Sequence, residues 1–152
     1  MTNDALQRLK SEIIELKRNK RRGRVRPHKL LLLLAVLDVA EEGLLDSNRI
    51  YFDGGLTARF EKYFDLHKQA DDLCQPSQPF FHLRSSPFWH HRIRPGREKA
   101  YMKLDTSGGG SKRIVDTIDY AFLSDYAFEV ISRDDTRREL RAFIEGLLRN
   151  GL

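Results

Sequence analysis

The sequence has 152 residues, a length typical of one domain with a hydrophobic core of its own. With 40% hydrophobic and 32% charged residues, its composition is that of a globular protein and not of a disordered chain. The longest apolar run, residues 30–37, is much shorter than the roughly 20 residues that cross a bilayer. The chain also begins with polar and acidic residues rather than with a secretory signal. We therefore expect a single domain over residues 1–152, located in the cytoplasm and away from membranes.

Helical periodicity and turn residues divide the first half of the chain. Leucine and isoleucine recur at helical spacing near the start, and a leucine-rich run follows a proline. These patterns predict an amphipathic helix over 4–18 and a buried helix over 27–42. A short strand is expected over 49–52, and aromatic residues at helical spacing predict a helix over 56–67.

The second half begins with a proline-rich polar loop over 71–79. Short aromatic or alternating runs separated by turn residues predict antiparallel strands over 80–83, 88–93 and 99–104. A glycine loop over 107–111 then leads to helices over 116–123, over 124–131 and from residue 134, with Ser124 and Ser132 as expected N-caps. Together the elements predict an α+β fold that is mostly helical, with a small antiparallel sheet of short strands in the middle of the chain.

Positive charge is concentrated between residues 17 and 29. The whole sequence has 27 lysines and arginines against 22 aspartates and glutamates. Eight of these cations stand in this one segment, with no carboxylate among them. Such a run is stabilised by a polyanion, and nucleic acid is the usual polyanion in the cytoplasm. The alternative is a basic loop that is only solvated.

Catalytic patterns are weak. The five histidines form neither a His-Glu-Xaa-Xaa-His nor a His-Asn-His pattern, and the adjacent His90 and His91 face opposite sides of an expected strand, where they cannot share a metal ion. Cys74 is the only cysteine, which excludes an internal disulfide, and we interpret it as a small buried hydrophobic residue. We expect no catalytic residue, no metal and no other cofactor. A minimal metal-dependent nuclease is the enzyme alternative.

The start of the leucine-rich helix has the properties of an anion-binding site. The free backbone N–H groups of a first helical turn attract anions. Arg24 and Arg26 can each form paired hydrogen bonds with a phosphate, His28 can donate one from its ring, and Lys29 adds a charge. The alternative is that His28 satisfies a polar group in the core and that Lys29 is only solvated.

Aromatic residues border cations further along the chain. Pro79, Phe80 and Phe81 directly precede His82, and Arg84 follows closely. Most such rings belong to a core, yet a proline and rings beside cations can also form a surface pocket that is both apolar and positive.

Five segments, taken in order, resemble one domain family. They are Arg-Pro-His-Lys-Leu-Leu-Leu-Leu-Leu at 26–34, Asn-Arg-Ile at 48–50, Pro-Phe-Phe-His-Leu-Arg-Ser at 79–85 with Phe-Trp after it, Val-Asp-Thr-Ile-Asp-Tyr-Ala-Phe-Leu at 115–123, and Arg-Arg-Glu-Leu-Arg at 137–141. Over nearly the whole chain they resemble the sulfur-binding domain of bacterial modification-dependent (type IV) restriction proteins, which recognises DNA with a phosphorothioate backbone. Because the His-Asn-His pattern of the associated nuclease does not occur here, we expect any cleavage to come from a separate nuclease domain or protein.

The resemblance implies two sets of residues that bind double-stranded DNA. The first forms the sulfur cavity or approaches it: Arg26, His28, Gln78, Pro79, Phe80 and His82. The second holds ordinary phosphates on either side: Arg22, Arg24, Lys29, Arg84, Lys112 and Arg113. Gln78, His82 and the glycine loop are also candidates for contacts with base edges. The alternative binding function is that of a general DNA or RNA binder without a preference for sulfur.

Overall fold

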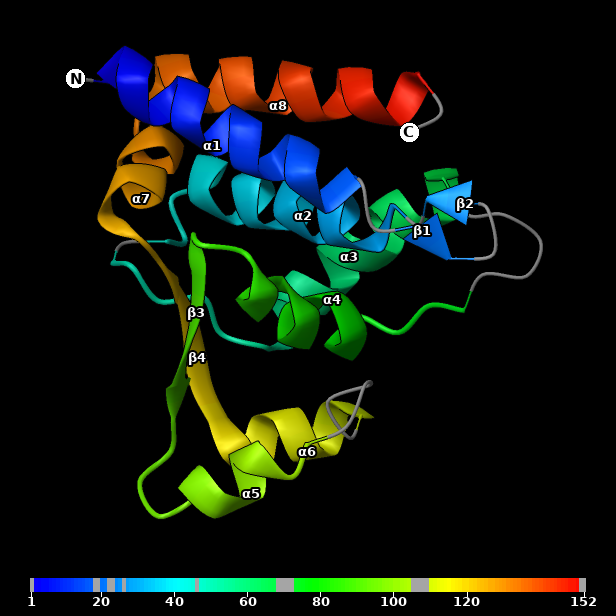
Figure 1. The fold of residues 1–152 in the computed structure, drawn as a ribbon, viewed down its shortest axis with the longest axis vertical. Coiled ribbons are helices and arrows are strands. Elements are labelled where there is room, and N and C mark those ends of the chain that lie inside the picture. The colour runs from blue at the N-terminus through cyan, green and yellow to red at the C-terminus, as the bar shows by residue number, and fades with distance from the viewer. Residues whose placement is uncertain are drawn as a thin grey trace.

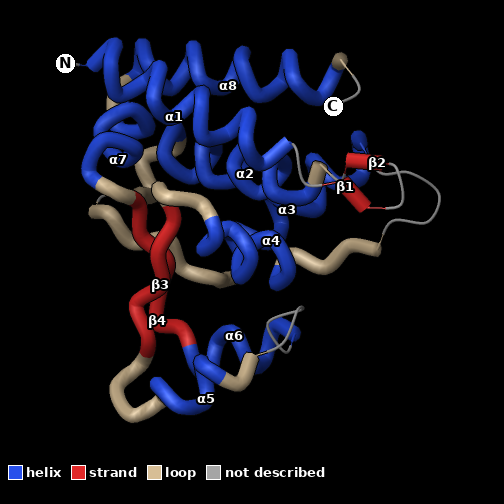
Figure 2. The backbone as a smooth tube through the Cα atoms, viewed as in Figure 1, coloured by secondary structure: helices blue, strands red, loops and turns tan. Residues whose placement is uncertain are grey.

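The computed structural model of the chain describes residues 2–17, 20–21, 24–25, 27–45, 47–67, 73–104 and 110–150. Helices make up most of these residues, and the described strands form two antiparallel pairs (Figure 2). The predicted class, a mostly helical α+β fold, is therefore confirmed. No helix in the described ranges is long and apolar enough to cross a membrane.

Helices packed around one buried helix form the body of the molecule (Figure 1). They are α1 (Thr2–Lys17), α2 (His28–Glu41), α3 (Gly54–His67), α7 (Asp125–Ser132) and α8 (Asp134–Arg149). Residues 30–37 of α2 are at most 4% exposed, because this helix is apolar on all sides and neighbouring helices cover it. The helices predicted for these five segments are confirmed. Ser124 precedes α7 as expected, but Ser132 is the last residue of α7, and Arg133 precedes α8.

A two-stranded ribbon extends from this body to a pair of short helices (Figure 1). Its strands are β3 (Trp89–Ile93) and β4 (Ile118–Leu123), and the helices at its far end are α5 (Glu98–Met102) and α6 (Gly110–Thr117). Ile50 adds a single bridge to Ala121 of β4, with N···O distances of 2.7 and 2.8 Å. The ribbon therefore connects the helical body to the α5–α6 pair.

Three predictions around the ribbon are wrong, and only the strand expected over 88–93 is confirmed. Residues 118–123, expected to be helical, form β4, whereas the strand expected over 99–104 is replaced by α5. The strand expected over 49–52 is reduced to the bridge at Ile50. Pairing with β3 decides the first case, since a strand partner far away in sequence overrides local helical spacing.

The loop expected over 71–79 and the strand expected over 80–83 are also corrected. Helix α4 (Ser77–His82) and a 3-10 turn, η1 (Leu83–Ser85), occupy this segment. Pro76 and Pro79 are tolerated because the N–H groups at a helix start have no partner within the helix. The N–H of Phe80 donates to the carbonyl of Pro76 at 3.2 Å and closes the first turn.

The basic segment and the glycine loop are described only in part. The backbone of β1 (Lys20–Arg21) pairs antiparallel with that of β2 (Arg24–Val25). Gly110 and Ser111 belong to the first turn of α6 instead of to a loop, and the rest of the predicted glycine loop lies outside the described residues.

A buried carboxylate joins three helices of the body. Asp38 of α2, which is 7% exposed, accepts hydrogen bonds from Lys62 and Tyr63 of α3 at 2.8 to 2.9 Å. Arg141 of α8 donates to the same carboxylate at 2.7 Å and to the Tyr63 hydroxyl at 2.9 Å. This cluster fixes α3 and α8 against α2.

Candidate nucleic-acid interface

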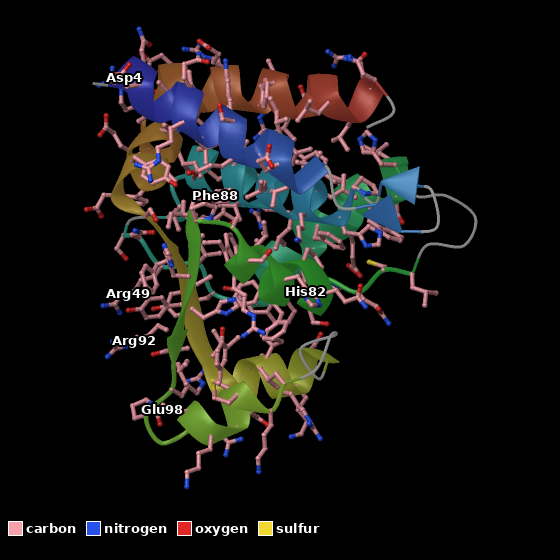
Figure 3. The ribbon with its side chains drawn as sticks, viewed as in Figure 1. Asp4, Arg49, His82, Phe88, Arg92 and Glu98 are labelled. Carbon is pink, nitrogen blue, oxygen red and sulfur yellow. The ribbon has the colours of Figure 1, made fainter. Side chains whose placement is uncertain are left out.

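Helix α4 carries the predicted sulfur-site residues and lies between two other elements of the predicted interface. It packs against α2, whose start holds His28 and Lys29, and against α6, which holds Lys112 and Arg113. The fold thus brings together three segments that are distant in sequence. Figure 3 shows His82 at α4, with Arg49 projecting from the opposite side of the β3–β4 ribbon.

Among the members of the predicted sulfur site that the structure describes, Gln78 and His82 are the accessible ones. They stand four residues apart in α4, so their side chains lie on one face of the helix, and both are half-buried. Pro79 lies next to Gln78 in the same helix and is buried. The pattern predicted a loop at Gln78 and a strand at His82, so it did not reveal that the two share a helix face.

Phe80 supports α4 from the inside and does not line a surface. Its side chain is 0% exposed and packs against Phe52, Trp89 and His91, with ring centroids 5.0 to 5.7 Å apart. The prediction that Phe80 contacts DNA is therefore corrected. In a helix, the residue two positions before His82 points away from it, whereas in the expected strand both would have shared a face.

The carbonyl of Phe80 anchors α4 to β3. Trp89 Nε1 donates to it at 3.0 Å, and His91 Nε2 lies 2.9 Å from it and must donate, since a carbonyl only accepts. His91 Nδ1 lies 2.9 Å from the Tyr101 hydroxyl and accepts from it when the ring is neutral. Burial, with a smaller contribution from Arg84, lowers the pKa of His91 to about 4. Sequence reasoning assigned no role to His91 or Tyr101.

Two cations act on His82. Burial lowers the pKa of His82, and the positive charges of Lys29 and Arg84 lower it further. Burial also lowers the pKa of Lys29, which is half-buried at the start of α2. Both groups are therefore less easily charged here than in water, and an anion placed beside them would raise both pKa values.

Arg84 combines a charge with an apolar surface. Its guanidinium carbon lies 4.0 Å from the ring centroid of Phe81 and 5.3 Å from that of Tyr101. The residue is exposed, and none of the described carboxylates forms an ion pair with it. Stacking on the two rings fixes the cation next to His82 without neutralising it.

Two of the other predicted phosphate-binding cations are described by the structure, and both are exposed on α6. Lys112 and Arg113 are exposed on α6, and the Lys112 ammonium, with its side chain 91% exposed, lies 3.8 Å from the Asp116 carboxylate. The side chains of Arg22, Arg24 and Arg26 lie outside the described residues.

His28 turns toward the core. It is 8% exposed, and its ring centroid lies 5.7 Å from that of Phe64 in α3. Of the two interpretations of this residue, the structure supports the core role, and the prediction of a ring donor facing a ligand is corrected. The backbone start of α2 and Lys29 remain on the interface side through the contact with α4.

Ser124 and His90 are in contact, but not in the arrangement of a nucleophile and its general base. The Ser124 hydroxyl donates to the carbonyl of Pro87 at 3.0 Å, so it accepts from His90 Nε2 at 2.8 Å and is not activated as a nucleophile. His90 and His91 do face opposite sides of β3, as predicted. Cys74 is exposed, which corrects its interpretation as a buried residue. Within the described part of the chain, no three His, Cys, Asp or Glu residues group as metal ligands.

Comparisons with known proteins give no family for this chain. No family model matches the sequence, and no curated protein matches it significantly.

Proposed function

We propose that this domain binds double-stranded DNA and prefers a phosphorothioate linkage in a short sequence context. The observation that carries the proposal is the arrangement at α4. There the half-buried His82 shares a helix face with Gln78, and it lies close enough to Lys29 and Arg84 for their positive charges to lower its pKa. The resemblance of five ordered sequence segments to sulfur-binding domains supports the same conclusion.

The chemistry of sulfur explains why this arrangement suits it. A sulfur atom in place of a phosphate oxygen is larger, more polarisable and less hydrated, but the linkage keeps its negative charge. It therefore favours apolar surface next to cations over a ring of N–H donors. Arg84, stacked on the buried ring of Phe81, supplies the cation of such a pairing, and Pro79 is the apolar residue assigned to it. Because Pro79 is buried, a sulfur atom reaches it only when neighbouring side chains move.

The remaining cations of the interface are assigned to ordinary phosphates. Lys112 and Arg113 on α6, together with Lys29 and Arg84, present charge on two sides of α4. Such contacts fix the register of a duplex without reading its sequence. Gln78 and His82 then remain as the groups for base edges, because amide and imidazole groups can bond to them.

One experiment tests the proposal directly. Matched duplexes with and without a single phosphorothioate are compared for binding and for cleavage, each with and without magnesium. We expect tighter binding of the modified duplex and no cleavage of either. Equal binding of both duplexes would instead indicate a general nucleic-acid binder. Cleavage that persists after repurification and is lost in a His82 or His90 variant would indicate a nuclease.

Two substitutions separate sulfur recognition from charge attraction. Pro79→Ala keeps α4 helical but removes ring atoms, so it should weaken binding of modified DNA by about 1 to 2 kcal/mol, or about 5- to 30-fold in Kd, and leave plain DNA unchanged. Lys112→Ala should weaken both duplexes equally and lower the salt slope by about one. Thermal unfolding of both variants serves as the folding control. An equal loss on both duplexes from Pro79→Ala would assign this residue to the scaffold alone.

The pH dependence of binding should report on His82. Its pKa is lowered in the free protein and should rise when an anion binds beside it, so binding takes up a proton. Affinity should therefore increase several-fold as the pH falls from about 7.5 to about 5.5. His82→Gln keeps a polar side chain that does not titrate, and its affinity should stay flat over this range. The same pH dependence in both proteins would exclude His82 from the site.

A further inference from the structure

A basic cleft lies at the far end of the β3–β4 ribbon, between α5 and α6. Its volume is about 420 Å³, and its lining includes Arg97 and Lys103 next to α5 and Lys112 and Arg113 of α6. All four cations are exposed. Arg97 and Lys103 belong to no motif that the sequence analysis identified.

The charges lining this cleft are unbalanced. Asp116 is the only acidic residue among its described lining residues, and it lies 3.8 Å from Lys112. None of the described carboxylates forms an ion pair with Arg97, Lys103 or Arg113. Four cations around a concave surface concentrate positive potential, which attracts an anion more strongly than the same charges spread over a flat surface.

The end of β3 connects the two walls of the cleft. At the end of β3, the Arg94 side chain donates from Nε to the carbonyl of Val115 at 2.7 Å, and its backbone N–H donates to the carbonyl of Thr117 at 2.9 Å. The N–H of Arg97 in turn donates to the carbonyl of Arg94 at 3.0 Å. These bonds fix α6 and the start of α5 to the same strand end, so the cations of both walls keep their spacing.

The cleft continues the interface at α4. Helix α6 packs against α4 and also forms one wall of the cleft, so the same helix borders both sites. Pockets for small molecules are lined mostly by apolar residues, whereas here four of the eight described lining residues are cations. This composition matches a surface that follows a phosphate backbone.

We propose that this cleft is a second phosphate-binding site, which takes phosphodiester groups of the duplex at a distance from the linkage recognised at α4. The inference rests on the proposed function for its DNA partner. Arg97 and Lys103 are the residues it adds to the interface. They contribute affinity and salt dependence but no preference for sulfur, because they meet only unmodified phosphates.

The test compares two double variants on two duplex lengths. Arg97→Gln with Lys103→Gln removes two cations from the cleft. Arg138→Gln with Arg149→Gln removes two exposed cations from α8, at the opposite end of the molecule (Figure 1). The duplexes carry one central phosphorothioate and have about 20 or about 8 base pairs, which at 3.4 Å per pair are about 68 and about 27 Å long. From the linkage, the longer one extends about 34 Å to each side and the shorter one about 14 Å, so the shorter one offers fewer phosphates to the cleft.

On the long duplex, the cleft variant should lose about 1.8 from the slope of log affinity against log salt, since each phosphate contact contributes about 0.9. Between about 50 and 200 mM salt, the factor by which its affinity falls should therefore be about ten times smaller than the factor for the wild type. On the short duplex its loss should be smaller, and the α8 variant should behave like the wild type on both. Arg97→Lys with Lys103→Arg keeps the charges and should restore the slope.

Three outcomes would overturn the inference. They are an unchanged slope on the long duplex, an equal loss on the short duplex, and an equal loss in the α8 variant. Inorganic phosphate serves as a separate probe: if the wild type binds it and the cleft variant does not, while duplex binding is equal in the two, the cleft takes free phosphate and not DNA. Plain and modified duplexes should show the same slope change, so a missing sulfur preference would contradict the proposed function without affecting this result.

Discussion

Asp38→Ala is expected to lower the free energy of unfolding by about 3 kcal/mol, the lower end of the range for breaking a buried ion pair. The carboxylate is 7% exposed. Burial by itself would raise the pKa of Asp38, but the hydrogen bonds from Lys62, Tyr63 and Arg141 outweigh this effect and hold the pKa below its usual value. Without the carboxylate, the guanidinium of Arg141 stays half-buried but loses its closest anionic partner.

Urea unfolding measures this effect, with Lys62→Ala as the matched control. The Lys62 side chain is 58% exposed, so water replaces most of its interaction, and its loss should cost less than about 1 kcal/mol. Asp38→Asn keeps the acceptor oxygen and should fall between the two. A cost for Asp38→Ala no larger than that for Lys62→Ala would show that solvent reaches the cluster and that it does not fix α3 and α8.

The helical body could be predicted because its signals are local. In α2 the leucine run is too long for a strand and is apolar on all sides, and α8 places Leu140 and Ile144 on one buried face. Such patterns specify a helix before any tertiary partner is known. The structure confirms each of them within a few residues.

The ribbon and α4 could not be predicted in the same way, because their structure depends on distant partners. The aromatic side chains and Ile118 within residues 118–123 favour a strand, but this local preference is weak, and β3 supplies the strand partner that decides it. The segment 77–82 is short and contains aromatic residues, which is a pattern typical of strands. Hydrogen bonds to the Phe80 carbonyl from Trp89 and His91 hold this segment as a helix, and a sequence does not reveal such contacts.

The candidate site shows the consequence of that error. The sequence identified the right residue types, but in a strand Phe80 and His82 share a face, whereas in a helix His82 shares its face with Gln78. His28 was interpreted in two ways for a similar reason, since the first residue of a helix can face either solvent or core. Contact with Phe64 decides for the core.

Acid is expected to destabilise the protein through His91, the residue that holds α4 to β3. Its pKa is about 4 in the folded protein against 6.5 for an unperturbed histidine, mainly because of burial. Between these values the unfolded chain binds more protons than the folded one, so stability rises with pH. The contribution of His91 should thus be complete above about pH 6.5 and should be lost as the pH falls toward about 4, with a total of about 3 kcal/mol.

The variant His91→Gln isolates this contribution from that of the carboxylates. A glutamine can donate to the Phe80 carbonyl and accept from Tyr101, but it does not titrate. The free energy of unfolding, measured in urea at several pH values, should fall about 3 kcal/mol less in the variant than in the wild type between about pH 7 and pH 4. Parallel curves for the two proteins would show that folding does not lower the pKa of His91, and the acid sensitivity would then come from other groups.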